Sequence, residues 1–141
     1  MFLLSSPSLA VQELRLVVTA DDYEEAVAFY RDVLGLPERA SYSSEDGRVT
    51  ILEVERATLE IADPGQADFI DAVEVGRRVA GKYRVAFEVE DSAATTQKLA
   101  DAGATVIAEP TRTPWNSLNA RLETPGGIQL TLFTELDLKQ V

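Results

Sequence analysis

The chain has 141 residues, of which 45% are hydrophobic, and it contains neither histidine nor cysteine. This length suits a single domain with a proper core, and the lack of cysteine excludes disulfides, thiolate catalysis and cysteine-based zinc sites. The net charge of −11, from 24 acidic and 13 basic residues, repels phosphate backbones and anionic membrane surfaces. Nucleic acid and membranes are therefore not expected as partners.

The first residues of the chain form an apolar run that has no basic residue and is too short for a secretory signal. No later apolar run approaches the roughly 20 residues that span a bilayer. A soluble, cytoplasmic protein is therefore expected.

The first predicted elements are an apolar strand at residues 16–20 and a helix that follows it. Asp21 or Asp22 can accept a backbone N–H as the N-cap, with an acidic residue nearby to complete a capping box. Apolar residues then recur at helical spacing until Gly35, which suits the left-handed position just beyond a helix.

Three short strands are predicted next, at residues 36–42, 49–54 and 57–61. A polar run with an Asp46-Gly47 turn signal joins the first two. The first part of the chain thus predicts a strand, a helix and three strands.

The stretch from residue 63 to residue 82 opens with Pro64-Gly65 and is predicted to be an irregular linker packed on the domain. Beyond it, strands are predicted at residues 83–89, 105–108, 117–123 and 128–133, with a helix at 92–102 and a tight turn at Thr124-Pro125-Gly126-Gly127.

The order of strand, acidic cap, helix and terminal glycine occurs twice, and the caps Asp22 and Asp91 are 69 residues apart (91 minus 22). We therefore predict one domain built from two copies of a module. The first module covers residues 12–62, the linker 63–82 and the second module 83–134.

Three segments of the chain resemble the vicinal oxygen chelate superfamily, which includes glyoxalase I, extradiol dioxygenases, fosfomycin-modifying enzymes and bleomycin resistance proteins. They are Ala28-Phe29-Tyr30-Arg31-Asp32-Val33-Leu34-Gly35-Leu36, Ala86-Phe87-Glu88-Val89-Glu90-Asp91, and Thr124-Pro125-Gly126-Gly127 before a strand. The resemblance covers about residues 12–134 and implies an α+β fold. In that fold, two βαβββ modules form a cupped mixed sheet around a cavity, commonly completed in a homodimer.

The resemblance also points to four positions that hold metal ligands in metal-dependent members. Counting back seven residues from each helix cap gives Arg15 and Arg84, and matching the last strand of each module gives Glu60 and Thr131. Only Glu60 suits a metal, because a guanidinium stays protonated and has no lone pair to offer. No metal or other cofactor is expected, and metal-dependent glyoxalase or dioxygenase activity is not expected either.

Two roles remain open for the arginines. Arg15 and Arg84 either pair with Glu60 or other carboxylates as a structural replacement for the metal, or they form a cationic floor. Such a floor would contact a carboxylate, phenolate or quinone oxygen of a ligand.

Aromatic residues supply the remaining candidates for ligand binding. Trp115, the only tryptophan, lies in a proline-bracketed loop, and its indole can stack on a flat aromatic ligand or simply pack at the rim of the barrel. Tyr42 and Phe87 could line the same cavity or belong to the core.

The sequence favours a metal-free protein that binds and sequesters a small aromatic drug or metabolite, as a homodimer with grooves between its subunits. No catalytic residue is assigned. One alternative is a cofactor-free lyase, isomerase or hydrolase that uses Glu60 as its base. Another is a structural or regulatory module whose cavity is filled.

Overall fold

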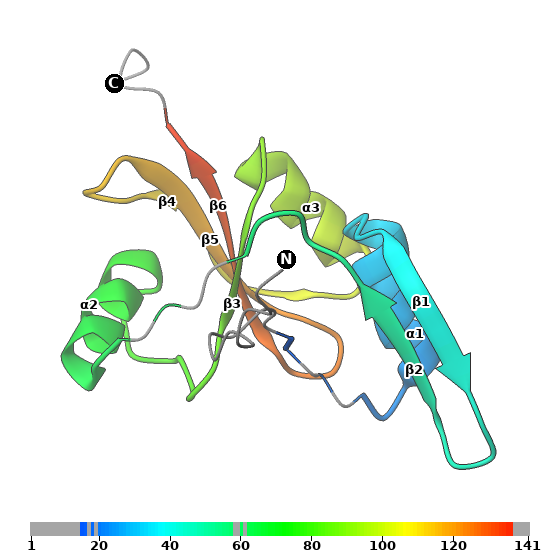
Figure 1. The fold of residues 1–141 in the computed structure, drawn as a ribbon. Helices are drawn as coiled ribbons and strands as arrows, with labels where there is room; N and C mark the ends of the chain where they lie inside the picture. The colour runs from blue at the N-terminus through cyan, green and yellow to red at the C-terminus, as the bar shows by residue number, and fades with distance from the viewer. Residues whose placement is uncertain (1–14, 17, 19, 58–59, 61, 137–141) are drawn as a thin grey trace, which may run out of the picture.

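The computed structural model describes residues 15–136, except 17, 19, 58, 59 and 61. Its elements are α1 (Tyr23–Val27), η1 (Ala28–Val33), β1 (Glu38–Ser43), β2 (Arg48–Leu52), α2 (Pro64–Glu74), β3 (Val85–Glu88), α3 (Ser92–Asp101), β4 (Thr105–Arg112), β5 (Ser117–Glu123) and β6 (Gln129–Glu135). The predicted α+β class is confirmed (Figure 1). None of the described helices is long and apolar enough to cross a membrane.

The second module forms a four-stranded sheet in the order β3-β6-β5-β4. β3 runs parallel to β6, whereas β5 is antiparallel to both of its neighbours. Together with α3, these strands complete the βαβββ order that was predicted for residues 83–134.

One face of this sheet carries the hydrophobic core. Ala120 and Leu122 of β5 lie beside Leu132 and Leu130 of β6, and all four are completely buried. Leu99 of α3 and a phenylalanine of η1 join the same cluster. Because side chains alternate along a strand, the residues between them point to the opposite face of the sheet.

The first helix of the chain begins as predicted, since the carboxylate of Asp22 accepts the backbone N–H of Glu25 at 3.0 Å. It then widens from α1 into the π-helix η1, in which the N–H of Leu34 donates to the carbonyl of Phe29 at 2.9 Å. Gly35 follows with φ of +81°, the left-handed conformation expected after a helix.

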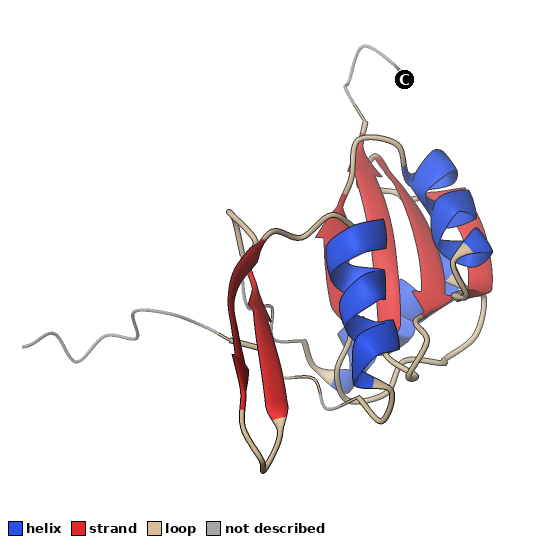
Figure 2. Cartoon of the chain, turned by 90° about the vertical axis from the view of Figure 1, so that its right-hand side faces the viewer, coloured by secondary structure: helices blue, strands red, loops and turns tan. Residues whose placement is uncertain are grey.

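β1 and β2 form a separate antiparallel hairpin, which stands apart from the larger sheet in Figure 2. The prediction of two further strands in this module, at 16–20 and 57–61, is wrong for the residues that the structure describes there, and residues 17, 19, 58, 59 and 61 lie outside that description. Most hairpin residues are exposed.

The linker contains a helix, so the prediction of an irregular stretch is wrong. Asp63 caps α2 by accepting the N–H of Gln66 at 2.8 Å, and Pro64 occupies the first turn. Asp followed by Pro is a typical start of a helix, because the proline lacks an N–H that would go unsatisfied there. α2 packs against β4 and β5 and carries buried acidic residues to the second face of the sheet.

Candidate functional site

The face of the sheet opposite the core holds a buried ion cluster centred on Arg121 of β5. Its guanidinium is completely buried and contacts two carboxylates of α2, with Nη1 at 2.8 Å from Asp71 Oδ1 and Nη2 at 3.0 Å from Glu74 Oε1. Both carboxylates are buried as well. Ion pairs therefore hold α2 on this face of the sheet, whereas apolar packing covers the other face.

Further hydrogen bonds occupy the remaining oxygens of these carboxylates. Asp71 Oδ2 accepts the N–H groups of Val79 and Ala80, each at 2.7 Å, and Glu74 Oε2 accepts the amide of Asn119 at 2.9 Å. Burial by itself raises the pKa of Asp71, but the two backbone N–H groups and Arg121 outweigh it and hold that pKa below its ordinary value. Asp71 is thus held in its charged form.

Thr131 and Arg84, two of the four positions inferred from the family resemblance, lie in direct contact at this cluster. Arg84 Nη1 donates to Thr131 Oγ1 at 2.7 Å, and Arg121 Nε lies 3.3 Å from the same oxygen. The hydroxyl itself donates to Glu74 Oε1 at 3.1 Å. A hydroxyl has one proton and two lone pairs, so this one has nothing left for another partner.

The half-buried Arg84 makes no ion pair with any residue that the structure describes. Burial and the neighbouring charge of Arg121 lower its pKa, and the charges of Glu74, Asp71 and Glu60 only partly offset this. Glu60 is exposed, as is Arg15. Arg84 therefore donates a hydrogen bond to Thr131, whereas one of the two roles predicted from the sequence paired it with a carboxylate.

These residues do not fit a divalent cation. Arg84 and Arg121 present only donors, and the Thr131 hydroxyl already uses both lone pairs. Within the described ranges, no group of three or more Asp or Glu side chains is placed to hold a metal ion.

Sequence reasoning missed the main members of the cluster, namely Asp71, Glu74, Asn119 and Arg121. Three signals were available. The Asp63-Pro64 start would have predicted α2, and a helix places residues three apart, such as Asp71 and Glu74, on one face. The third signal was Arg121 between Ala120 and Leu122 in a predicted strand, because an arginine that such a strand buries requires a partner.

Trp115 lies in the turn between β4 and β5, where the next residue, Asn116, adopts a positive φ of 65°. The indole is 42% exposed and approaches the ring of Phe69 on α2, with 6.1 Å between ring centroids and 50° between planes. Phe69 is half exposed. The two rings form a partly exposed aromatic pair between α2 and the β4–β5 turn.

The other two aromatic candidates lie elsewhere. Phe87 of β3 packs against the hydrophobic core, on the face opposite Arg84 and Thr131. Tyr42 is exposed on β1 and pairs across the hairpin with Val49. The described structure of one chain thus brings together Arg84 and Thr131, but neither Tyr42 nor Phe87 joins them.

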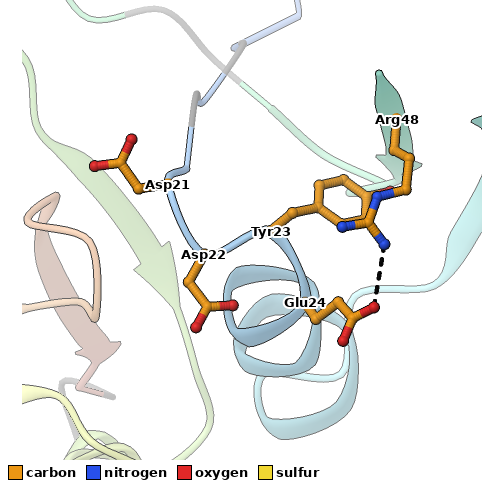
Figure 3. A pocket seen from close by; sticks show the side chains of 5 residues that line it. All are labelled: Asp21, Asp22, Tyr23, Glu24 and Arg48. Atoms are coloured by element: carbon orange, nitrogen blue, oxygen red, sulfur yellow. Dashed lines mark hydrogen bonds and ion pairs between the residues drawn. The ribbon is translucent and has the colours of Figure 1, made fainter. Parts of the chain in front are cut away.

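Two open surface depressions lie beside α1 and the hairpin, with volumes of about 550 and 430 Å³. Figure 3 shows the larger one, in which the Arg48 guanidinium lies 4.4 Å from the centre of the Tyr23 ring and 3.1 Å from a Glu24 oxygen. Tyr42 borders the smaller one, whereas Trp115 and Arg84 border neither. The polar side chains around these depressions largely pair with one another.

The second module is a βαβββ unit with α3 on one face of its sheet and a polar cluster on the other. This arrangement places the protein among the α+β proteins. The chain belongs to the Glyoxalase/Bleomycin resistance protein/Dioxygenase superfamily, whose model matches residues 14–132. None of the curated proteins that were compared with the chain matches it.

Solved structures with a similar fold include an antibiotic-binding protein, TnmS3, from Streptomyces sp. CB03234. It is 22% identical, with 92% of this chain and all of the other covered and a TM-score of 0.59. A hypothetical protein from S. aureus is 14% identical, with 89% and 95% covered and a TM-score of 0.61. A superfamily member from Sphaerobacter thermophilus is 20% identical, with 84% and 92% covered and a TM-score of 0.56.

Proposed function

We propose that the protein binds a small aromatic drug or metabolite without a metal ion and protects its target by sequestration. The observation that carries the metal-free part is the Thr131 hydroxyl, which accepts from Arg84 and Arg121 and donates to Glu74. A position that would ligate a metal in a metal-dependent relative is thus occupied by protein contacts. Without that Lewis acid, binding is favoured over turnover.

Exposed aromatic side chains support a flat ligand. Trp115 is 42% and Phe69 49% exposed, and an aromatic ligand that stacks on such a ring gains about 0.5–1.5 kcal/mol beyond its burial. The antibiotic-binding neighbour shares the fold, and the fold alone does not assign its ligand to this chain.

The ligand groove in this proposal lies between two subunits of a cytoplasmic homodimer. Tyr42 and Val49 share one face of the hairpin with Ala40 and Ile51, opposite the polar pairs Ser41–Thr50 and Ser43–Arg48. Tyr42 is 63% and Val49 47% exposed in one chain. A partner that covers this apolar face would bury it and complete a groove with Tyr42 in its wall.

A second candidate is a structural or regulatory module with a filled cup. It is favoured by α2, which closes over Arg121 and fills part of the polar face with Asp71 and Glu74. An enzyme that uses Glu60 as its base has no such support, because Glu60 is exposed and no described contact orients it.

The first test follows the fluorescence of Trp115, the only tryptophan, during titration with a panel of aromatic antibiotics and metabolites. Each bound compound is then released and chromatographed. Saturable quenching with the compound recovered unchanged is the expected result. Recovery of a product would instead indicate an enzyme, and silence across the panel would favour the filled module.

A parallel measurement tests the metal-free part. The purified protein is equilibrated with Zn²⁺, Ni²⁺, Mn²⁺ or Fe²⁺, freed of loosely held ions, and assayed for metal content. We expect far less than one ion per chain and ligand binding that is unaffected by a chelator. A stoichiometric ion, together with loss of ligand binding in chelator, would contradict the proposal.

A further inference from the structure

The Arg84 guanidinium has unused binding capacity on the polar face, beside the edge strand β3. Of its five N–H donors, one donates to Thr131 at 2.7 Å, and the described residues offer the others no acceptor at hydrogen-bond distance. A half-buried cation with most of its donors unpaired is costly unless something satisfies it.

The two carboxylates of the buried cluster, Asp71 and Glu74, are already committed to other partners. Both oxygens of Glu74 are occupied, by Arg121 and Thr131 on one side and Asn119 on the other. Both oxygens of Asp71 are occupied as well, by Arg121 and two backbone N–H groups. The cluster therefore neutralises Arg121 by direct contact and leaves Arg84 without a contacting anion.

Arg84 lies at an edge of the four-stranded sheet. It lies directly before β3, which pairs only with β6 among the strands that the structure describes. The next residue on the same face is Ala86, which is small and exposed. Along β3, the neighbour of Arg84 on this face is therefore not a bulky side chain.

We propose that Arg84 anchors an anionic oxygen of the ligand, a carboxylate or a phenolate attached to an aromatic ring. This inference rests on the proposed function and names its ligand class. The planar guanidinium fork matches a carboxylate in a two-point contact. Burial and the adjacent Arg121 lower the pKa of Arg84, so an anion that contacts it also relieves an unfavourable electrostatic environment.

The test uses calorimetric titration of the full chain with naphthalene-2-carboxylate and with the neutral, nearly isosteric naphthalene-2-carboxamide. A second pair, 4-nitrophenolate and 4-nitroanisole, separates phenolate from carboxylate recognition. We expect at least one anion to bind about tenfold or more tightly than its neutral partner. Arg84→Gln is expected to abolish that ratio, whereas Arg31→Gln keeps it. The control removes the same charge from an exposed ion pair with Asp32 and Glu38.

Equal affinity for both members of each pair, or a ratio that survives in Arg84→Gln, would overturn the inference. If none of the four probes binds but a neutral aromatic compound quenches Trp115 and is recovered unchanged, the inference falls and the proposed function stands. If nothing in the panel binds, both fall. Should Arg84→Gln not fold, Arg84→Lys replaces it. A reduced preference for the anion is then expected, and an unchanged preference overturns the inference.

Discussion

At the scale of single residues, two buried threonines differ in what their hydroxyls do. Thr131 Oγ1 joins Arg84, Arg121 and Glu74, whereas Thr96 Oγ1 is buried without a hydrogen-bond partner in the described structure. A Thr→Val change therefore removes three hydrogen bonds at position 131, but removes only an unsatisfied hydroxyl at position 96.

Thr131→Val is expected to lower the free energy of unfolding by about 1–3 kcal/mol, because it leaves buried charged groups without a partner. Thr96→Val, the matched control, is expected to be neutral or stabilising. Urea unfolding followed by circular dichroism measures both. Equal effects of the two substitutions would contradict this view of the cluster.

The Asp71 carboxylate makes stability depend on pH in a defined direction. Its pKa is lower in the folded state, so it stabilises the fold above the ordinary aspartate pKa of about 4 and loses that contribution as the pH falls through the folded value. We expect the free energy of unfolding of the wild type to fall more steeply with acidification below about pH 4 than that of Asp71→Asn. Urea titrations at a series of pH values compare the slopes, and parallel slopes would exclude the effect.

At the scale of elements, three helices begin at aspartates whose carboxylates accept a backbone N–H, namely Asp22, Asp63 and Asp91. Among these caps we test that of α3, because this helix contributes the fully buried Leu99 to the core and its loss would affect the stability of the whole domain. The contact joins Asp91 Oδ1 to the N–H of Ala94 at 3.0 Å.

Asp91→Ala is expected to cost about 1 kcal/mol, since one N–H at the start of the helix loses its acceptor. Asp21→Ala removes the same charge beside α1, where Asp22 is the cap, and should change stability little. Thermal unfolding of the two variants measures the loss of stability in each. A comparable loss in both would assign the effect to net charge.

At the scale of the whole molecule, the hairpin presents an apolar face that one chain leaves largely open. Tyr42→Glu on that face is expected to convert the proposed dimer into a monomer, because it places a charge in the buried contact. Ser43→Glu, on the opposite face and paired with Arg48, is the control and should remain dimeric. Light scattering coupled to size-exclusion chromatography gives the masses. A monomeric wild type would refute the dimer directly.

Local signals predicted much of the fold. The caps at Asp22 and Asp91, the glycine that ends the first helix and the alternation in β5 and β6 are all encoded in near neighbours, and the family resemblance extends over both modules. Asp63 and Pro64 are a typical helix start and encode α2 locally, but Pro64-Gly65 is equally typical of an irregular stretch.

What the sequence by itself determined is the α+β class, the superfamily and the poor fit of two arginines to a metal. Only the tertiary structure decided that Arg84 meets Thr131 and that Arg121 joins the same cluster. Glu74 reaches Arg121 across 47 residues and Thr131 across 57. Such contacts depend on how α2 packs over the sheet, and no local pattern specifies that packing because its partners are brought together only when the chain folds.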